Sequence, residues 1–166
     1  MADGPVILWP AGVAVALVWL VFRDPAFDYR LAVAGALLPD LVDGPLGGAR
    51  VLHTVAAAVV VLTGVMLLTR SRRRARRHWL AVPIGMFVHL IADAMWARTE
   101  TFWWPAFGWD LQGRLPALDH GLAVLLIEEA AGAALLAWSW RRFRLSDPAV
   151  RSTFFRTGHL PRDLVG

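Results

Sequence analysis

Several histidines and acids stand within or beside segments that are otherwise apolar. His89 and Asp93 have the i,i+4 spacing that places two side chains on one helix face. Asp40 and Asp43 are three residues apart, and His53 begins another apolar segment. An acid at the centre of a membrane helix costs about 2.5–3.5 kcal/mol on insertion scales. We therefore expect these side chains to face one another, water or a bound cation, which indicates a functional site.

Together these residues supply two imidazoles and three carboxylates. They are Asp40, Asp43, His53, His89 and Asp93. Nitrogen and oxygen donors suit a divalent metal, zinc first and manganese or iron as alternatives. The chain has no cysteine, so thiolate ligands and disulfides are excluded. The set allows one metal with an acid–base residue or a two-metal site. A simpler interpretation also stands: histidine–carboxylate bonds can pack helices, paired acids can form a solvated turn, and a single histidine is often structural.

More polar residues occur in and before the last apolar segment. Glu128 and Glu129 are adjacent, so they point about 100° apart on a helix and cannot both face one pocket. We expect one of them to carry a proton beside the metal and the other to pair elsewhere, with Glu128 as the candidate catalytic residue. Asp119 and His120 are interpreted as an interfacial cap before this segment.

The elements that position these residues are predicted to be membrane helices. The chain has 166 residues, 57% of them hydrophobic, and its mean hydropathy is +0.51, more apolar than ordinary soluble domains. About 20 apolar residues cross a bilayer, and four segments qualify: Pro5–Phe22, Val51–Thr69, Trp79–Ala97 and Leu122–Trp140. Leu31–Leu41 is expected to be a short span or a re-entrant half-helix. The predicted fold is an all-α membrane protein, a bundle of four to five transmembrane helices.

Arginine positions predict the orientation. Six arginines lie within residues 70–77, and Arg141, Arg142 and Arg144 follow the last segment. The positive-inside rule places both groups in the cytoplasm of a bacterial cytoplasmic (inner) membrane. Five crossings then put the N-terminus outside and bring the candidate site near the extracytoplasmic face. The same rule explains the net charge of +4, so we expect no nucleic-acid partner.

The chain divides into two predicted parts, a polytopic membrane domain (residues 1–144) and a cytoplasmic C-terminal tail (residues 145–166). Asp147 and Pro148 resemble an N-cap and first-turn pair, and Gly158 resembles a helix stop. The tail is therefore expected to be an amphipathic helix on the membrane surface or a disordered segment.

Four short motifs follow one another between residues 31 and 109. They are Gly35–Asp40, His53-Thr54, His89–Asp93 and Phe102–Pro105. Their order and spacing resemble those of the YdjM-like membrane-bound metal-dependent hydrolases of bacteria. The chain departs from that pattern because residues 48–54, G-A-R-V-L-H-T, lack the first of two family histidines. In addition, the second aspartate follows Asp40 by three residues instead of two.

The resemblance implies a metal-dependent hydrolase acting on a membrane lipid or a lipid-like phosphoester. In that hypothesis the five candidate ligands hold the metal, which activates a water nucleophile. Two alternatives remain from the residues alone. One is a non-enzymatic membrane protein that handles ions or protons, and the other is a structural membrane partner whose polar groups only pack helices.

Overall fold

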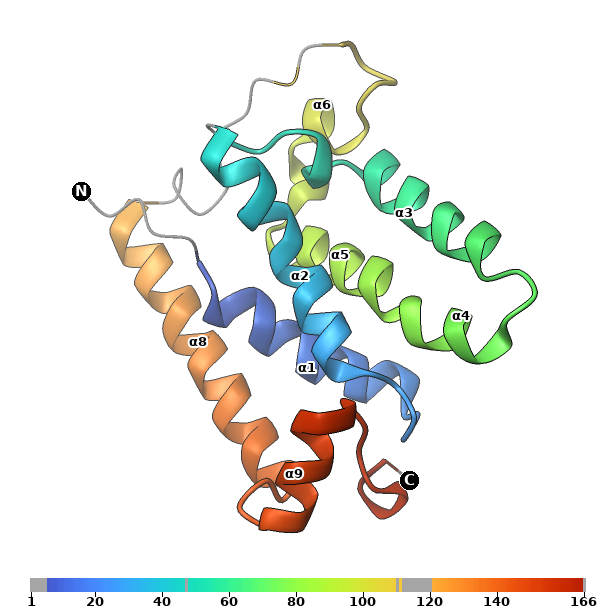
Figure 1. Ribbon diagram of the computed structural model, residues 1–166. Helices are drawn as coiled ribbons and strands as arrows, with labels where there is room; N and C mark the ends of the chain where they lie inside the picture. Colours follow the sequence, from blue (N-terminus) through green and yellow to red (C-terminus); the bar gives the residue numbers. More distant parts are fainter. Residues whose placement is uncertain (1–5, 47, 110, 112–120, 166) are drawn as a thin grey trace.

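The computed structural model describes residues 6–46, 48–109, 111 and 121–165, and Figure 1 shows their arrangement. These residues form helices and no strand, which confirms the all-α class. The main helices are α1 (Leu8–Phe22), α2 (Tyr29–Asp43), α3 (Val55–Leu68), α5 (Ala81–Ala92) and α8 (Gly121–Arg142). The shorter ones are α4 (Arg73–Trp79), α6 (Thr99–Phe102) and α9 (Pro148–Thr157). Short 3₁₀ turns cover Gly44–Leu46 (η1), Val51–His53 (η2), Met95–Ala97 (η3) and Arg162–Leu164 (η4).

Helix α8 is the one helix in the described part of the chain that is long and apolar enough to cross a membrane. Its 22 residues correspond to a length of about 33 Å. Helices α1 and α3 are apolar but shorter. Helix α5 ends at Ala92 and not at the predicted Ala97, because Ala94 adopts a left-handed conformation with φ of 49°. A bundle of four to five spans therefore stays a prediction.

Helix α2 occupies the segment for which a short span or half-helix was expected. Asp28 caps its N-terminus by accepting hydrogen bonds from two backbone N–H groups of the first turn. The helix then runs through Pro39 to Asp43. Proline has no N–H, so the helix loses one internal hydrogen bond there but continues. As a result Asp40 and Asp43 both lie on the last turn of one helix, and both are buried.

Helices α2 and α5 cross closely at Gly35 and Gly85, with α2 in the middle of the molecule (Figure 1). A Cβ atom on Gly35 would lie 2.1 Å, and one on Gly85 2.0 Å, from a backbone carbonyl oxygen of the other helix. Only glycine permits this approach. Asp40 follows Gly35 by five residues and His89 follows Gly85 by four, so the crossing brings these two side chains to neighbouring turns.

Helix α8 packs along α1 (Figure 1). The two backbones meet at Gly12 and Gly132, where an added Cβ atom would lie 2.6 Å and 2.2 Å from backbone atoms of the partner helix. One turn away, Oε1 of Glu129 accepts hydrogen bonds from the backbone N–H groups of residues 7–9 at 2.9–3.3 Å. These donors have no partner within α1, so Glu129 serves as its N-terminal cap.

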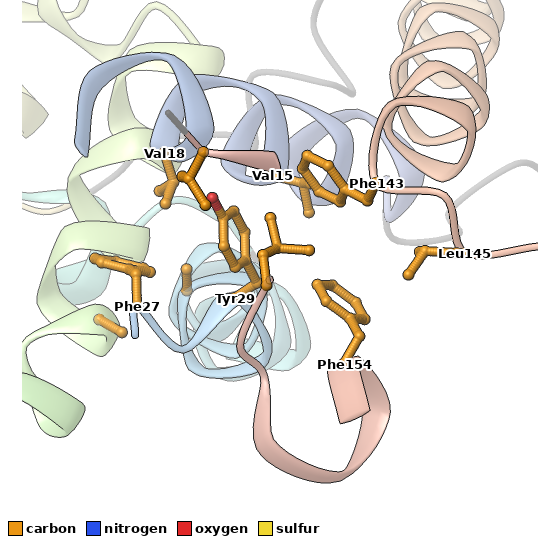
Figure 2. Packing of buried hydrophobic residues seen from close by; sticks show 11 residues of the cluster. Val15, Val18, Phe27, Tyr29, Phe143, Leu145 and Phe154 are labelled. Carbon is orange, nitrogen blue, oxygen red and sulfur yellow. The ribbon is translucent and has the colours of Figure 1, made fainter. Parts of the chain in front are cut away.

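Residues 145–165 fold back on α1 and α2. Asp147 caps α9, and Gly158 ends it with φ of 76°, as the sequence predicted. The carbonyl of Gly158 accepts a hydrogen bond from the N–H of Tyr29 at 3.0 Å. Figure 2 shows Phe154 of α9 packed beside Tyr29 in one buried apolar cluster. The C-terminal segment thus shares a core with the helices that precede it.

Candidate metal centre

Four side chains bring one nitrogen or oxygen atom each into a single cluster. They are Asp40 from α2, His53 from η2, His89 from α5 and Asp93 at the end of α5. Their ligand atoms all lie within 4.8 Å of one another, so the cluster could bind a metal ion. The side chains of both histidines are fully buried, while those of Asp40 and Asp93 are 9% and 12% exposed.

The spacing of these atoms suits a small divalent ion. Nε2 of His53 lies 3.2 Å from Oδ1 of Asp40 and 3.3 Å from Nε2 of His89. Nε2 of His89 lies 3.7 Å from Oδ1 of Asp40 and 3.5 Å from Oδ2 of Asp93. Tetrahedral zinc with bonds of about 2.0–2.1 Å separates its ligand atoms by about 3.3–3.4 Å. Small side-chain adjustments would therefore bring the four donors to coordination distance.

Asp43 lies behind the His53 ring and outside this group of four. Its Oδ2 accepts a hydrogen bond from Nδ1 of His53 at 2.9 Å, and from the N–H groups of Arg50 and Leu52 at 3.0 and 2.9 Å. Because the carboxylate accepts at this position, we assign the His53 proton to Nδ1. The lone pair on Nε2 then faces the cluster, which is the arrangement that carboxylates impose on metal-binding histidines.

His53 owes its position to the start of α3. Thr54 caps that helix, since its Oγ1 accepts from the N–H of Ala57 at 3.0 Å and donates to the carbonyl of Val51 at 2.7 Å. Thr54 is fully buried, so this turn cannot shift without losing both bonds. The His53-Thr54 pair of the sequence motif is thus a candidate ligand followed by a helix cap.

His89 is oriented differently. Its ring meets that of His53 edge-on, with centroids 5.1 Å apart. Nδ1 has no partner with hydrogen-bond geometry within the described residues, although the carbonyl of Ala36 interacts with the ring. The close crossing at Gly85, one turn earlier, is therefore the main constraint on where this imidazole lies.

Two further charged residues interact electrostatically with the cluster. The charges of Glu128 and Arg98 both act on Asp93, one repelling and one attracting its carboxylate. Glu129 instead faces α1, so the adjacent glutamates diverge as expected from helical spacing. Sequence reasoning did not name Arg98 as a site residue. The one feature that distinguished it is that few arginines lie on the side predicted to be extracytoplasmic. Asp119 and His120 lie outside the described residues.

No protein-family model, curated protein or solved structure matches the chain. The resemblance to YdjM-like hydrolases therefore stays a prediction, and the functional argument depends on the geometry of the cluster.

Proposed function

We propose that the protein is a membrane-embedded metal-dependent hydrolase that acts on a lipid-like phosphoester. The observation that carries the proposal is the convergence of Asp40, His53, His89 and Asp93 from separate elements. Buried carboxylates this close repel one another unless a cation or proton relieves them. Two imidazoles and two carboxylates suit zinc, with manganese or iron as alternatives. When bound, such a metal would lower the pKa of water to about 7 and polarise a phosphoryl oxygen.

We propose that the four donors have different roles at the metal. A metal with four protein ligands in a tetrahedron is closed, whereas a catalytic metal keeps one position for water or substrate. We assign Asp40 and the two histidines as fixed ligands. We assign Asp93, whose side chain is 12% exposed, as the donor that gives up its position to water or substrate. We assign Glu128, whose charge acts on Asp93, as the residue that would accept the proton of a metal-activated water.

The positive charge of Arg98 favours an anionic substrate. The guanidinium of Arg98 attracts the carboxylate of Asp93 electrostatically. Arginine binds phosphate oxygens in charge-assisted hydrogen bonds, so a phosphoester is a better match than a neutral ester.

The exposed apolar surface supports a location in the membrane. Large hydrophobic side chains on the outer faces of α3 and α8 are exposed, among them Val60, Leu67, Leu68, Leu122 and Ile127. Patches of this kind mark lipid or protein contacts. The basic residues of α4 precede His89 by at least 12 residues of nearly continuous helix, or about 18 Å. We propose that the protein has four to five spans, with the centre toward the extracytoplasmic face and both α4 and the C-terminus in the cytoplasm, as the positive-inside rule predicts.

The test is hydrolysis of lipid phosphoesters by the purified protein, first stripped with a chelator and then reloaded with zinc, manganese or iron. Turnover should disappear on chelation, return with metal, and be absent from His89→Ala. Stoichiometric metal binding without turnover of any phosphoester would contradict the proposal.

A second candidate function follows from the number of donors. If all four side chains stay on the ion, the centre is closed and acts as a structural or ion-handling site. Metal would then bind with no activity, and His89→Ala would lower thermal stability or ion flux into liposomes. Measuring metal content, turnover and flux on the same two proteins separates the two functions.

A further inference from the structure

The connection from α3 to α4 carries a dense positive charge on the surface of the molecule. We call residues 70–74 the basic turn, and its four arginines are all exposed: Arg70, Arg72, Arg73 and Arg74. None of their side chains forms an ion pair or a hydrogen bond within the described residues. Four like charges within five residues repel one another, and an anion relieves that repulsion. The charge therefore fits an anionic partner, and the neighbouring surface indicates which one.

The opposite end of α4 uses its polar side chains to hold the helix in place. Nε of Arg77 donates to Oδ2 of Asp24 at 3.0 Å. Nδ1 of His78 lies 3.3 Å from Oδ2 of Asp28, the buried cap of α2. These two contacts attach α4 to the chain between α1 and α2. The basic turn is thus positioned without any contribution from its own charges, which stay available to a partner.

An exposed apolar surface borders the basic turn. Met66, Leu67 and Leu68 form the last turn of α3, and Leu68, at 86%, is the most exposed large hydrophobic side chain among the described residues. One residue, Thr69, separates Leu68 from Arg70. Figure 1 shows this connection at the margin of the molecule, with α3 and α4 running back from it. The apolar and the positive surface therefore meet at one place.

Hydrocarbon next to a phosphate group is the chemistry of a phospholipid. A free anion or a nucleic acid would satisfy the arginines but would leave the leucines of α3 in water, whereas an acyl chain would cover them. Arginine binds phosphate oxygens through charge-assisted hydrogen bonds. Each basic residue beside a membrane surface raises the affinity for anionic lipid about fivefold.

We propose that the basic turn binds the phosphate groups of anionic phospholipids, whose acyl chains lie against the exposed end of α3. The proposal rests on the membrane location proposed above and is independent of hydrolysis. Arg74 precedes His89 by 15 residues of nearly continuous helix, or about 22 Å. A lipid bound at the basic turn is therefore distinct from a substrate at the metal centre.

Lipid titration of the full-length protein in dodecylmaltoside tests the proposal. The probe is pyrene-labelled phosphatidylglycerol, and its binding is read by energy transfer from the tryptophans. Phosphatidylcholine with the same labelled chain is the reference lipid. The unchanged protein should bind phosphatidylglycerol at least about 10-fold more tightly than phosphatidylcholine. The preference should decrease as salt rises from about 0.05 to about 0.5 M, because salt screens exposed charges.

Two matched variants show whether the basic turn itself binds the lipid. The first removes its four charges together and should weaken phosphatidylglycerol binding more than about 50-fold while leaving phosphatidylcholine unchanged; it combines Arg70→Gln, Arg72→Gln, Arg73→Gln and Arg74→Gln. The second removes the same charge from exposed arginines elsewhere and should change the affinity less than about 3-fold; it combines Arg23→Gln, Arg141→Gln, Arg156→Gln and Arg162→Gln.

A third variant tests the contact with the acyl chains. Leu67→Gln and Leu68→Gln together should weaken binding of both lipids about 3- to 10-fold, because the apolar surface that the chains cover is lost. Both side chains are exposed, so the packing of α3 should be unchanged.

Four results would overturn the proposal. Equal loss of affinity in the two arginine variants would show a general effect of net charge. Inorganic phosphate that binds as tightly as phosphatidylglycerol would show an anion site without lipid. Tighter binding of an RNA oligonucleotide, lost in the first variant, would show a nucleic-acid site. The fourth is no preference for phosphatidylglycerol over phosphatidylcholine. Metal content and turnover measured on the same proteins keep this result separate from the proposed hydrolysis, since lipid affinity is read without either.

Discussion

Two carboxylates hold the imidazole of His53 from opposite sides, and they are expected to affect metal binding differently. Asp43→Asn removes the anionic acceptor for Nδ1 but no ligand atom of the cluster. Loss of such an orienting partner typically weakens metal binding about 10- to 100-fold. Competition titration against a chromophoric chelator measures this change. Asp163→Asn is the control, because Asp163 is exposed and pairs with Arg144 at the surface. Equal affinities in the two variants would contradict the assigned role of Asp43.

The spacing of Asp40 and Asp43 predicted that both acids lie near the metal, and it could not predict which one turns toward it. That choice is made by the backbone N–H groups of Arg50 and Leu52, which converge on Asp43. Their direction depends on the irregular chain before α3, and no residue pattern encodes it. The convergence of the other acids and histidines followed from the predicted order of segments.

Glu128 and Glu129 are adjacent and should give opposite phenotypes. Glu129→Ala leaves three N–H donors of α1 without their acceptor, so we expect a loss of about 1–2 kcal/mol in the free energy of unfolding and little change in metal affinity. Glu128→Gln should keep stability and metal content but lower turnover. Thermal unfolding and metal analysis of both variants check the assignment, which fails if the two phenotypes are exchanged.

At the scale of helices, the crossing of α2 and α5 determines whether the cluster forms. In Gly85→Ala the added Cβ atom would lie 2.0 Å from a carbonyl oxygen of α2, so the helices must separate. We expect loss of metal binding and a decrease of at least about 2 kcal/mol in stability. Gly64→Ala is the matched control: nothing lies within 4 Å of its Cβ position, and alanine in the middle of α3 should stabilise by about 0.5–1 kcal/mol. Denaturant unfolding in detergent measures both.

The positions of the helices were predicted from the sequence better than their ends. Hydropathy locates apolar segments but does not show where a helix ends. Helix α5, for example, ends before Ala94, which has a left-handed backbone conformation. Pro39 lies inside α2, and the helix accepts it at the cost of one hydrogen bond. The close packing of α2 against α5 at Gly35 and Gly85 is not visible in a single segment.

At the scale of the whole molecule, Asp28 joins α2 to α4 at the end of α2 opposite the metal centre. It caps α2, pairs with Arg30, and lies 3.3 Å from Nδ1 of His78. Burial raises the pKa of its carboxyl, but hydrogen bonds from Arg30 and from the N–H of Leu31 outweigh burial, and the net pKa is below the ordinary 3.8. The stabilisation is therefore complete above about pH 4 and is lost as pH falls through the lower folded-state pKa.

Asp28→Asn should consequently lower the free energy of unfolding by about 1–2 kcal/mol at pH 7. The difference from the unchanged protein should shrink as the pH falls below about 4, because the native carboxyl then becomes neutral as well. Unfolding curves at a series of pH values test this prediction. A difference that stays constant down to pH 2 would show that the charge of Asp28 contributes nothing.

The predicted division at residue 144 shows what composition leaves out. The arginines and the expected caps predicted a short polar tail that could form a helix. Asp147 and Gly158 do mark the two ends of helix α9. The sequence could not show that Phe154 and Leu160 pack with Tyr29, because that contact joins residues more than 120 positions apart. Because of this long-range packing, Phe154 and Leu160 of the predicted tail belong to the same buried core as Tyr29.

The bonds that Arg50, Leu52 and His53 make to Asp43 do not involve any of the four ligand atoms. Entry of an ion thus requires no reordering of the chain between α2 and α3, and little conformational entropy is lost when the centre fills. The backbone amides of Arg50 and Leu52 should exchange with deuterium equally slowly in zinc-loaded and chelator-treated protein. The rate of zinc uptake should then be independent of any folding step between α2 and α3.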